Sequence, residues 1–121
     1  MRLEPVSAHA YFSLGCVLHD PETLAEAIGA YQKSLELAPG QVEVTANLGE
    51  AFLQLGQFEE AREVLVRAEK INPTNPKLHH LLGEVYLKLG MRDQAVHEHN
   101  VLRKISDSLA AELAESLDKP S

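Results

Sequence analysis

The sequence predicts an all-α protein in which pairs of helices recur along the chain. Residues of three kinds return at an interval of 34 positions: a leucine-glycine pair, an alanine and, in two units, a closing proline. They are Leu14-Gly15, Leu48-Gly49 and Leu82-Gly83, then Ala27, Ala61 and Ala95, then Pro39 and Pro73. The composition agrees, because 45% hydrophobic with only 5% aromatic residues suits helices packed through leucine and alanine better than a β-sandwich.

A unit of this length with these residues at fixed offsets resembles the tetratricopeptide repeat (TPR) family, whose unit is a helix–turn–helix. The resemblance covers about residues 8–105 and implies a right-handed superhelical solenoid of antiparallel helix pairs. It implies a single domain over residues 1–121, with seven helices. The expected repeats span about 8–41, 42–75 and 76–106, and a capping helix follows at about 107–118. The sequence departs from the family pattern at Thr45, His79 and His99, which stand where aromatic residues are usual.

The first repeat contains two expected helices, over about 8–19 and 23–37. Ser7 stands at the N-cap of the first helix, where its hydroxyl would accept a hydrogen bond from a free backbone N–H group. Thr23 and Glu26 have the spacing of a capping box at the start of the second helix.

The second and third repeats follow the same plan. Their expected helices span about 42–55, 58–71, 76–89 and 92–105. Gly56 and Gly90 mark the turn within each pair, and Asn75-Pro76 provides an N-cap followed by proline at the first helical position. The third repeat ends less distinctly, because Asp107 takes the place of the closing proline.

The last expected helix departs from the repeat. Leu109, Leu113 and Leu117 form an apolar stripe at i, i+4 spacing, and acidic residues occupy the opposite side. The end of a repeat array exposes an apolar face that needs a helix with a polar outer side. We therefore interpret this segment as a cap; the alternative is a helix that docks into a groove of another molecule.

Charge and cysteine content exclude several classes of partner and site. Eighteen acidic residues against eleven basic ones give a net charge of −7, which disfavours nucleic acid or an anionic membrane as the main target. A single cysteine, Cys16, rules out an intrachain disulfide. No apolar stretch approaches the length of a membrane span. We expect a soluble, cytoplasmic chain, and leave open a targeting segment on a longer protein.

The resemblance also predicts a binding surface. If the leucine-glycine face of each first helix is buried, a second face points away from the partner helix, and in TPR proteins that face lines a concave groove. The groove residues expected here are His9, Phe12, Cys16, His19, Glu43, Asn47, Glu50, Leu53, Lys77, His80, Leu81, Glu84 and Leu87. Four of them are apolar and three are glutamates, which suits a peptide or helix with apolar anchors and basic residues. The alternative is that the leucines pack on neighbouring repeats and the glutamates are ordinary solvated surface.

One well-known TPR recognition mode does not fit. A carboxylate clamp of lysine, asparagine and arginine holds the acidic C-terminal tail of cytosolic heat-shock chaperones. Asn47 and Lys77 fall at clamp positions, but Phe12, Cys16 and Leu81 replace the other three clamp residues. Because the nearby glutamates would repel an acidic tail, the sequence argues against this partner.

Catalysis and metal binding find little support. Cys16 and His19 share a helix face, but no third orienting group or oxyanion donor accompanies them. His80, Glu84 and His9 point toward one groove without forming a recognised metal signature. The sequence therefore predicts no enzyme activity, no cofactor and no metal site.

Two residues outside the groove receive ordinary structural interpretations. Glu69 is expected to form an intrahelical ion pair on the solvated convex surface, with basic neighbours of helix 58–71. His79 falls in a column of residues that the repeat buries.

We predict that the chain is a protein–protein interaction module, an adaptor or assembly scaffold that binds a peptide or helix of a partner protein in its concave groove. Two alternatives stay open: a self-assembling structural module, and the targeting part of a larger enzyme. The expected oligomeric state is a monomer or a weak homodimer.

Overall fold

The computed structural model describes residues 7–118, without the side chains of residues 107 and 108, and this range contains seven helices and no strand. The helices are α1 (Ala8–Leu18), α2 (Leu24–Leu37), α3 (Val42–Leu55), α4 (Phe58–Ile71), α5 (Pro76–Lys88), α6 (Arg92–Ile105) and α7 (Asp107–Asp118). The predicted all-α fold is confirmed. The predicted single domain also includes residues 1–6 and 119–121, which lie outside the described residues.

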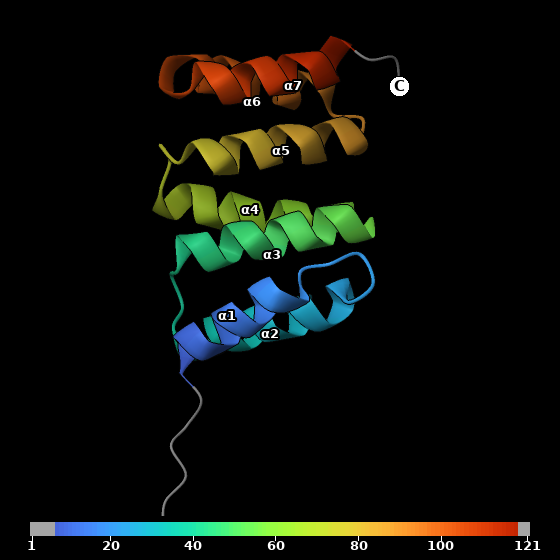
Figure 1. The fold of residues 1–121 in the computed structure, drawn as a ribbon. Coiled ribbons are helices and arrows are strands. Elements are labelled where there is room, and N and C mark those ends of the chain that lie inside the picture. The colour runs from blue at the N-terminus through green and yellow to red at the C-terminus, as the bar shows by residue number, and fades with distance from the viewer. Residues whose placement is uncertain (1–6, 119–121) are drawn as a thin grey trace, which may run out of the picture.

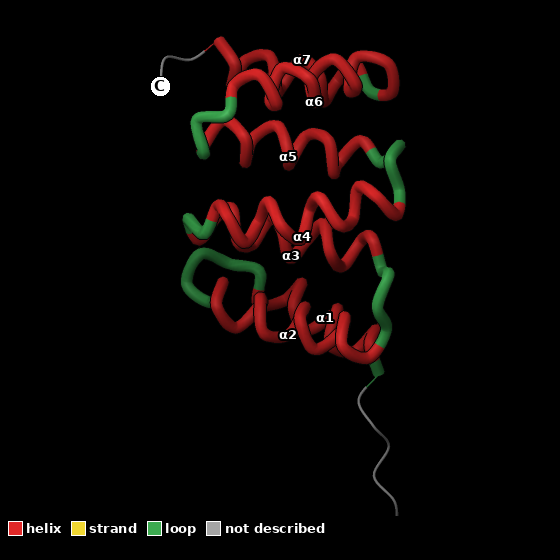
Figure 2. The backbone as a smooth tube through the Cα atoms, turned by 180° about the vertical axis from the view of Figure 1, so that it is seen from behind, coloured by secondary structure: helices red, strands yellow, loops and turns green. Residues whose placement is uncertain are grey.

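The helices stack in one direction, from α1 and α2 at one end to α6 and α7 at the other (Figure 1). The turns within the pairs α1–α2, α3–α4 and α5–α6 lie on one side of the stack, and the links between pairs lie on the other (Figure 2). The second helix of each pair packs on the next helix along the chain. This antiparallel stacking is a helical solenoid, in which each pair contacts its neighbours. Across residues 7–118, no helix combines the length and apolar character that a bilayer crossing needs.

The helix starts follow the sequence signals with one exception. The Ser7 hydroxyl accepts a hydrogen bond from the backbone N–H of Ala10 at 3.0 Å. The Asn75 side chain accepts one from the N–H of Leu78 at 3.3 Å. The capping box expected at Thr23 is wrong, because the Thr23 hydroxyl donates to the carbonyl oxygen of Leu18 at 2.6 Å. This bond ties the turn back to the end of α1 instead of capping α2.

The recurring glycines sit where two helices approach closely. A Cβ atom on Gly49 would lie 2.5 Å from the side chain of Leu65 on α4, and one on Gly15 would lie 2.5 Å from the ring of Tyr31 on α2. Such distances are far inside van der Waals contact, so only glycine fits. Gly83 differs, because the side chain above it belongs to Leu113 of α7.

In the first leucine-glycine pair Gly15 is buried, but the leucine is not buried as expected. Leu48 and Leu82 are 3% and 0% exposed, whereas Leu14 is 47% exposed and Val17, on the same helix, is 79% exposed. The second and third leucines have a preceding helix pair to pack against. No helix precedes α1 within the described residues, so the outer face of α1 is uncovered there.

The last helix covers the other end of the stack. It follows α6 after one residue, Ser106, and packs against both α5 and α6. Leu113 and Leu117 are buried in a second apolar cluster with residues of α6, and Leu109 is half-buried beside them. The Ser116 hydroxyl donates to a carboxylate oxygen of Glu84 at 2.6 Å. The helix therefore attaches to the stack through apolar and polar contacts.

Candidate protein-binding groove

The face predicted to form the groove is continuous across the first helices of the three pairs. The side-chain amide of Asn47 on α3 donates to the Cys16 sulfur on α1 at 3.7 Å. The Lys77 ammonium on α5 donates to the amide oxygen of Asn47 at 2.9 Å. These two bonds join three helices that are some 30 residues apart in sequence. Three of the predicted residues therefore form a ladder across the stack.

A hollow of about 300 Å³ lies along this ladder. It is lined by Cys16, His19, Tyr31, Asn47, Glu50, Gln54 and Lys77. Five of the seven were predicted from the sequence, and Tyr31 and Gln54 were not. Tyr31 belongs to the second helix of its pair and reaches the hollow because Gly15 has no side chain in its path. The sequence held a signal for this contact, because Tyr31 stands at the same distance after Gly15 as Leu65 does after Gly49.

His19 connects the two unpredicted residues. Its Nε2 lies 2.8 Å from the side-chain oxygen of Gln54, and its Nδ1 lies 2.8 Å from the Tyr31 hydroxyl. Because the amide oxygen accepts, Nε2 carries the hydrogen and Nδ1 accepts from Tyr31. Both ring nitrogens are therefore engaged away from Cys16, and the thiol–imidazole pair considered from the sequence does not form in this arrangement.

The electrostatics of the hollow are mixed. The Lys77 ammonium lies 3.4 Å from a carboxylate oxygen of Glu50, and both side chains are partly exposed. Burial, with a smaller contribution from Cys16, raises the pKa of the Tyr31 hydroxyl, so this group stays a neutral hydrogen-bond donor. The hollow thus presents amide, hydroxyl, carboxylate and ammonium groups side by side.

The apolar part of the groove is smaller than expected. Leu81 is 5% exposed and belongs to the core, so it leaves almost no surface for a partner. Phe12 and Leu53 are half-buried against the core, and Leu87 is half-buried against the cluster of α6 and α7. Leu81 is lost to the groove because α3 and α5 contact each other directly and this side chain packs into the core cluster between the helix pairs.

The remaining predicted residues lie outside the hollow. Glu84 is occupied by its bond from Ser116 of α7, and His80 is half-buried on the same helix. His9 and Glu43 are exposed near the starts of α1 and α3.

A larger cleft, of about 700 Å³, lies on a different part of the molecule, lined by residues of α2, α3 and α4 and of the link between α2 and α3. Leu35, Thr45, Phe52 and Val64 are among its lining residues. Thr45 stands where the repeat pattern usually has an aromatic residue. The small threonine leaves the junction between the first two pairs open, and this cleft was not predicted.

Family comparisons agree with the repeat pattern. Three family models match the chain: two described as tetratricopeptide repeat, over residues 8–41 and 30–63, and one described as TPR repeat, over residues 49–90.

Curated relatives are much longer proteins. The chain is 34% identical over 104 residues to tetratricopeptide repeat protein 21A of Mus musculus, which covers 84% of this chain and 8% of the relative. It is 26% identical over 105 residues to the TPR repeat-containing thioredoxin TTL4 of Arabidopsis thaliana, covering 87% of this chain and 15% of the relative. The chain thus spans less than a fifth of the length of either relative.

Solved structures share the fold at low identity. PcrH in complex with the chaperone binding region of PopB superposes with a TM-score of 0.83 at 19% identity, covering 93% of this chain and 96% of that one. The second TPR of Spaghetti, bound to an HSP90 peptide, gives 0.79 at 18% identity, covering 83% and 93%. The matches to the tetratricopeptide repeat models, with 34% identity over 84% of the chain to tetratricopeptide repeat protein 21A, show that the chain belongs to the tetratricopeptide repeat family.

Proposed function

We propose that the three helix pairs and α7 act as one protein-interaction domain, an adaptor or scaffold that binds a peptide or short helix of a partner in the hollow around Cys16, Asn47 and Lys77. The observation that carries this proposal is the ladder of polar side chains across α1, α3 and α5, which offers hydrogen-bonding groups on an open face. Two structural neighbours, PcrH and the Spaghetti domain, are each bound to a segment of another protein, which supports the same kind of role here.

The charge of the groove favours a basic, apolar ligand. Lys77 is the one lysine or arginine among the predicted groove residues, and it is already paired with Glu50. Glu43 is exposed nearby, and Phe12 and Leu53 offer half-buried apolar surface. A segment with lysine or arginine beside an apolar side chain complements these groups. An acidic peptide would meet more carboxylates than ammonium groups, so we propose a partner different from the HSP90 peptide of the Spaghetti domain.

Charge reversal in the groove tests the proposal. The test variant carries Glu43→Lys and Glu50→Lys, and the control carries Glu112→Lys and Glu115→Lys, which make the same charge change on exposed positions of α7. Each is compared with the native domain in capture of partners from a lysate of the source cell and in binding to arrays of basic, apolar peptides. We expect native and control proteins to bind alike and the groove variant to lose binding. Equal binding by all three would move the site away from the groove.

Self-association is a second candidate, favoured by the exposed apolar face of α1. Leu14 and Val17 lie three residues apart on this helix and are both exposed. Two copies that associated through this face would bury the Leu14 side chain of each copy. Light scattering over a range of protein concentrations distinguishes a monomer from a dimer, and Leu14→Ser with Val17→Ser would abolish a dimer formed in this way. A mass that stays monomeric at high concentration would exclude self-association.

A further inference from the structure

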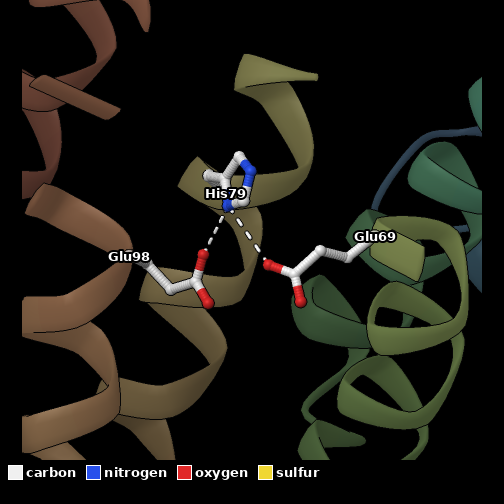
Figure 3. A group of neighbouring side chains, drawn as sticks. All are labelled: Glu69, His79 and Glu98. Carbon is white, nitrogen blue, oxygen red and sulfur yellow. Dashed lines mark hydrogen bonds and ion pairs between the residues drawn. The ribbon is translucent and has the colours of Figure 1, made fainter. Parts of the chain in front are cut away.

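Three ionisable side chains meet at the junction between the second and third helix pairs (Figure 3). Glu69 comes from α4, His79 from α5 and Glu98 from α6. The Nδ1 atom of His79 lies 2.6 Å from a carboxylate oxygen of Glu98 and 3.2 Å from one of Glu69. The side chains of His79 and Glu98 are each 5% exposed, and that of Glu69 is 27% exposed. The surface ion pair expected for Glu69 is therefore wrong, since this carboxylate turns toward the buried imidazole.

At all three positions the residue differs in kind from its equivalent at the preceding junction, between the first and second helix pairs. The residues 34 positions earlier in the sequence are Leu35, Thr45 and Val64, and all three line the cleft between the first two pairs. A lone buried carboxylate or imidazole would be strongly unfavourable, so such groups occur in complementary sets. Here three helices each contribute one member. This junction therefore contains a cluster of three ionisable side chains where the equivalent positions hold two apolar residues and a threonine.

The orientation of the histidine is fixed by its other nitrogen. Nε2 of His79 lies 2.5 Å from the backbone carbonyl oxygen of Pro73. A carbonyl oxygen only accepts, so Nε2 donates its hydrogen to Pro73. In the protonated ring Nδ1 donates to the carboxylate of Glu98, and when that proton leaves, the lone pair on Nδ1 faces both carboxylates. Histidines that bind metals characteristically donate their second ring N–H to a carbonyl or carboxylate in this way.

The charge of the cluster is not balanced by the imidazole. Two carboxylates contribute two negative charges, and a protonated imidazole would neutralise one of them. Burial and the neighbouring Glu98 raise the pKa of Glu69, and the hydrogen bond to Glu98 raises the pKa of His79. A divalent cation bound to a neutral imidazole would neutralise both carboxylates.

We propose that Glu69, His79 and Glu98 form a binding site for a divalent first-row transition-metal ion of the Zn²⁺ type. Their ligand atoms lie within 4.8 Å of one another. Two ligands on a tetrahedral zinc ion with bonds near 2.0–2.1 Å lie about 3.3 Å apart, which the separation of His79 and Glu69 already matches. The Glu98 oxygen would have to move away from Nδ1 by about 0.7 Å. Imidazole with carboxylates suits zinc or cobalt, whereas Mg²⁺ and Ca²⁺ prefer six or more oxygen ligands.

Such an ion would join the second and third helix pairs directly. Glu69 belongs to one pair, and His79 and Glu98 belong to the next. His79 is also two residues from Lys77 on α5, the helix that supplies one side of the groove hollow. The bound ion would therefore stabilise the junction between the second and third helix pairs, and with it the position of α5 beside the hollow.

The experiment compares native protein with Glu69→Leu/His79→Thr/Glu98→Val, which installs the residues that the chain itself uses at the preceding junction. The variant keeps Cys16 and the other five histidines, so surface binding is the same in both proteins. After removal of metal with a chelator, Zn²⁺ is titrated by calorimetry, Co²⁺ binding is followed by its visible absorption, and melting temperatures are recorded with and without Zn²⁺.

We expect the native protein to bind one additional ion per chain, at least about tenfold more tightly than any site the variant retains, and to melt at a higher temperature with Zn²⁺ only when the cluster is intact. Mg²⁺ should have no such effect. Equal zinc stoichiometry, affinity and stabilisation in the two proteins would overturn the proposal.

Single substitutions keep the test decisive if the triple variant does not fold. Glu69→Gln alters the most exposed ligand and leaves the bond between His79 and Glu98 in place. Its matched control is Glu63→Gln, an exposed glutamate on the same helix. The first change should weaken Zn²⁺ binding about tenfold or more and remove the Co²⁺ absorption, and the control should change neither. Unchanged binding in Glu69→Gln would overturn the proposal as well.

Discussion

Single glycines decide how closely the two helices of a pair approach. Gly49→Ala should lower the free energy of unfolding by about 1–2 kcal/mol, because the added methyl group collides with the buried Leu65 and the cost exceeds the gain in helix propensity. Gly29→Ala is the control, since Gly29 is exposed within α2 and no atom lies within 4 Å of an added Cβ. That change should raise the free energy of unfolding by about 0.5–1 kcal/mol. Urea denaturation measures both, and a gain in both variants would contradict the close contact between Gly49 and Leu65.

Sequence reasoning at the residue scale succeeded where one helix face decides the environment. Cys16, Asn47 and Lys77 were assigned to one surface by counting from the leucine-glycine pairs, and the structure joins them. Glu69 was misplaced for the opposite reason. Its exposure depends on what the next two helices present, and only a comparison of equivalent junctions brings it together with His79 and Glu98.

The last helix supplies the side chain that covers the glycine of the third pair. In the first two pairs the second helix covers the glycine, but in the third pair Leu113 of α7 lies over Gly83. His99 occupies the position equivalent to Leu65, and it is partly exposed. Leu113→Ala should therefore cost about 2–5 kcal/mol of stability, as for other fully buried leucines.

Leu109→Ala is the comparison for this change. Leu109 is half-buried on the same helix, so its truncation should cost only about 1 kcal/mol. Both values follow from chemical denaturation monitored by circular dichroism. If the two substitutions cost the same, α7 does not serve as the apolar cover of the third pair.

Helix positions were the most predictable feature of the elements. Glycines and prolines recur at the turns, and these residues limit helices whatever surrounds them. The way in which α7 packs on α5 was harder to predict from the sequence. The links before α3 and α5 span residues 38–41 and 72–75, but the link before α7 is Ser106 alone, so the helix meets α5 in its own register. The capping box at Thr23 failed because a tertiary bond to the carbonyl of Leu18 competed for the hydroxyl.

The two junctions between helix pairs differ in the side chains that they contain. In a repeat protein each pair contacts its neighbours, so stability is approximately a sum of pair and junction contributions. The first junction has an open cleft beside Thr45, and the second holds the charged cluster around His79. The 34-residue period predicted that the pairs stack. The period did not predict this difference, because it rests on the residues that the repeats share. The two junctions differ at positions where the repeats have different residues.

This difference leads to a prediction for the metal-free protein. His79→Thr alone removes the imidazole from between two carboxylates and leaves the buried Glu98 without its partner, so it should lower the free energy of unfolding by about 3–5 kcal/mol. The triple change Glu69→Leu/His79→Thr/Glu98→Val should cost less than the single one, because it removes every charge and leaves no uncompensated group. Urea denaturation in the presence of a chelator measures both variants against the native protein. A triple variant less stable than His79→Thr would mean that the cluster stabilises the junction through packing, and that charge compensation contributes little to holding the second and third pairs together.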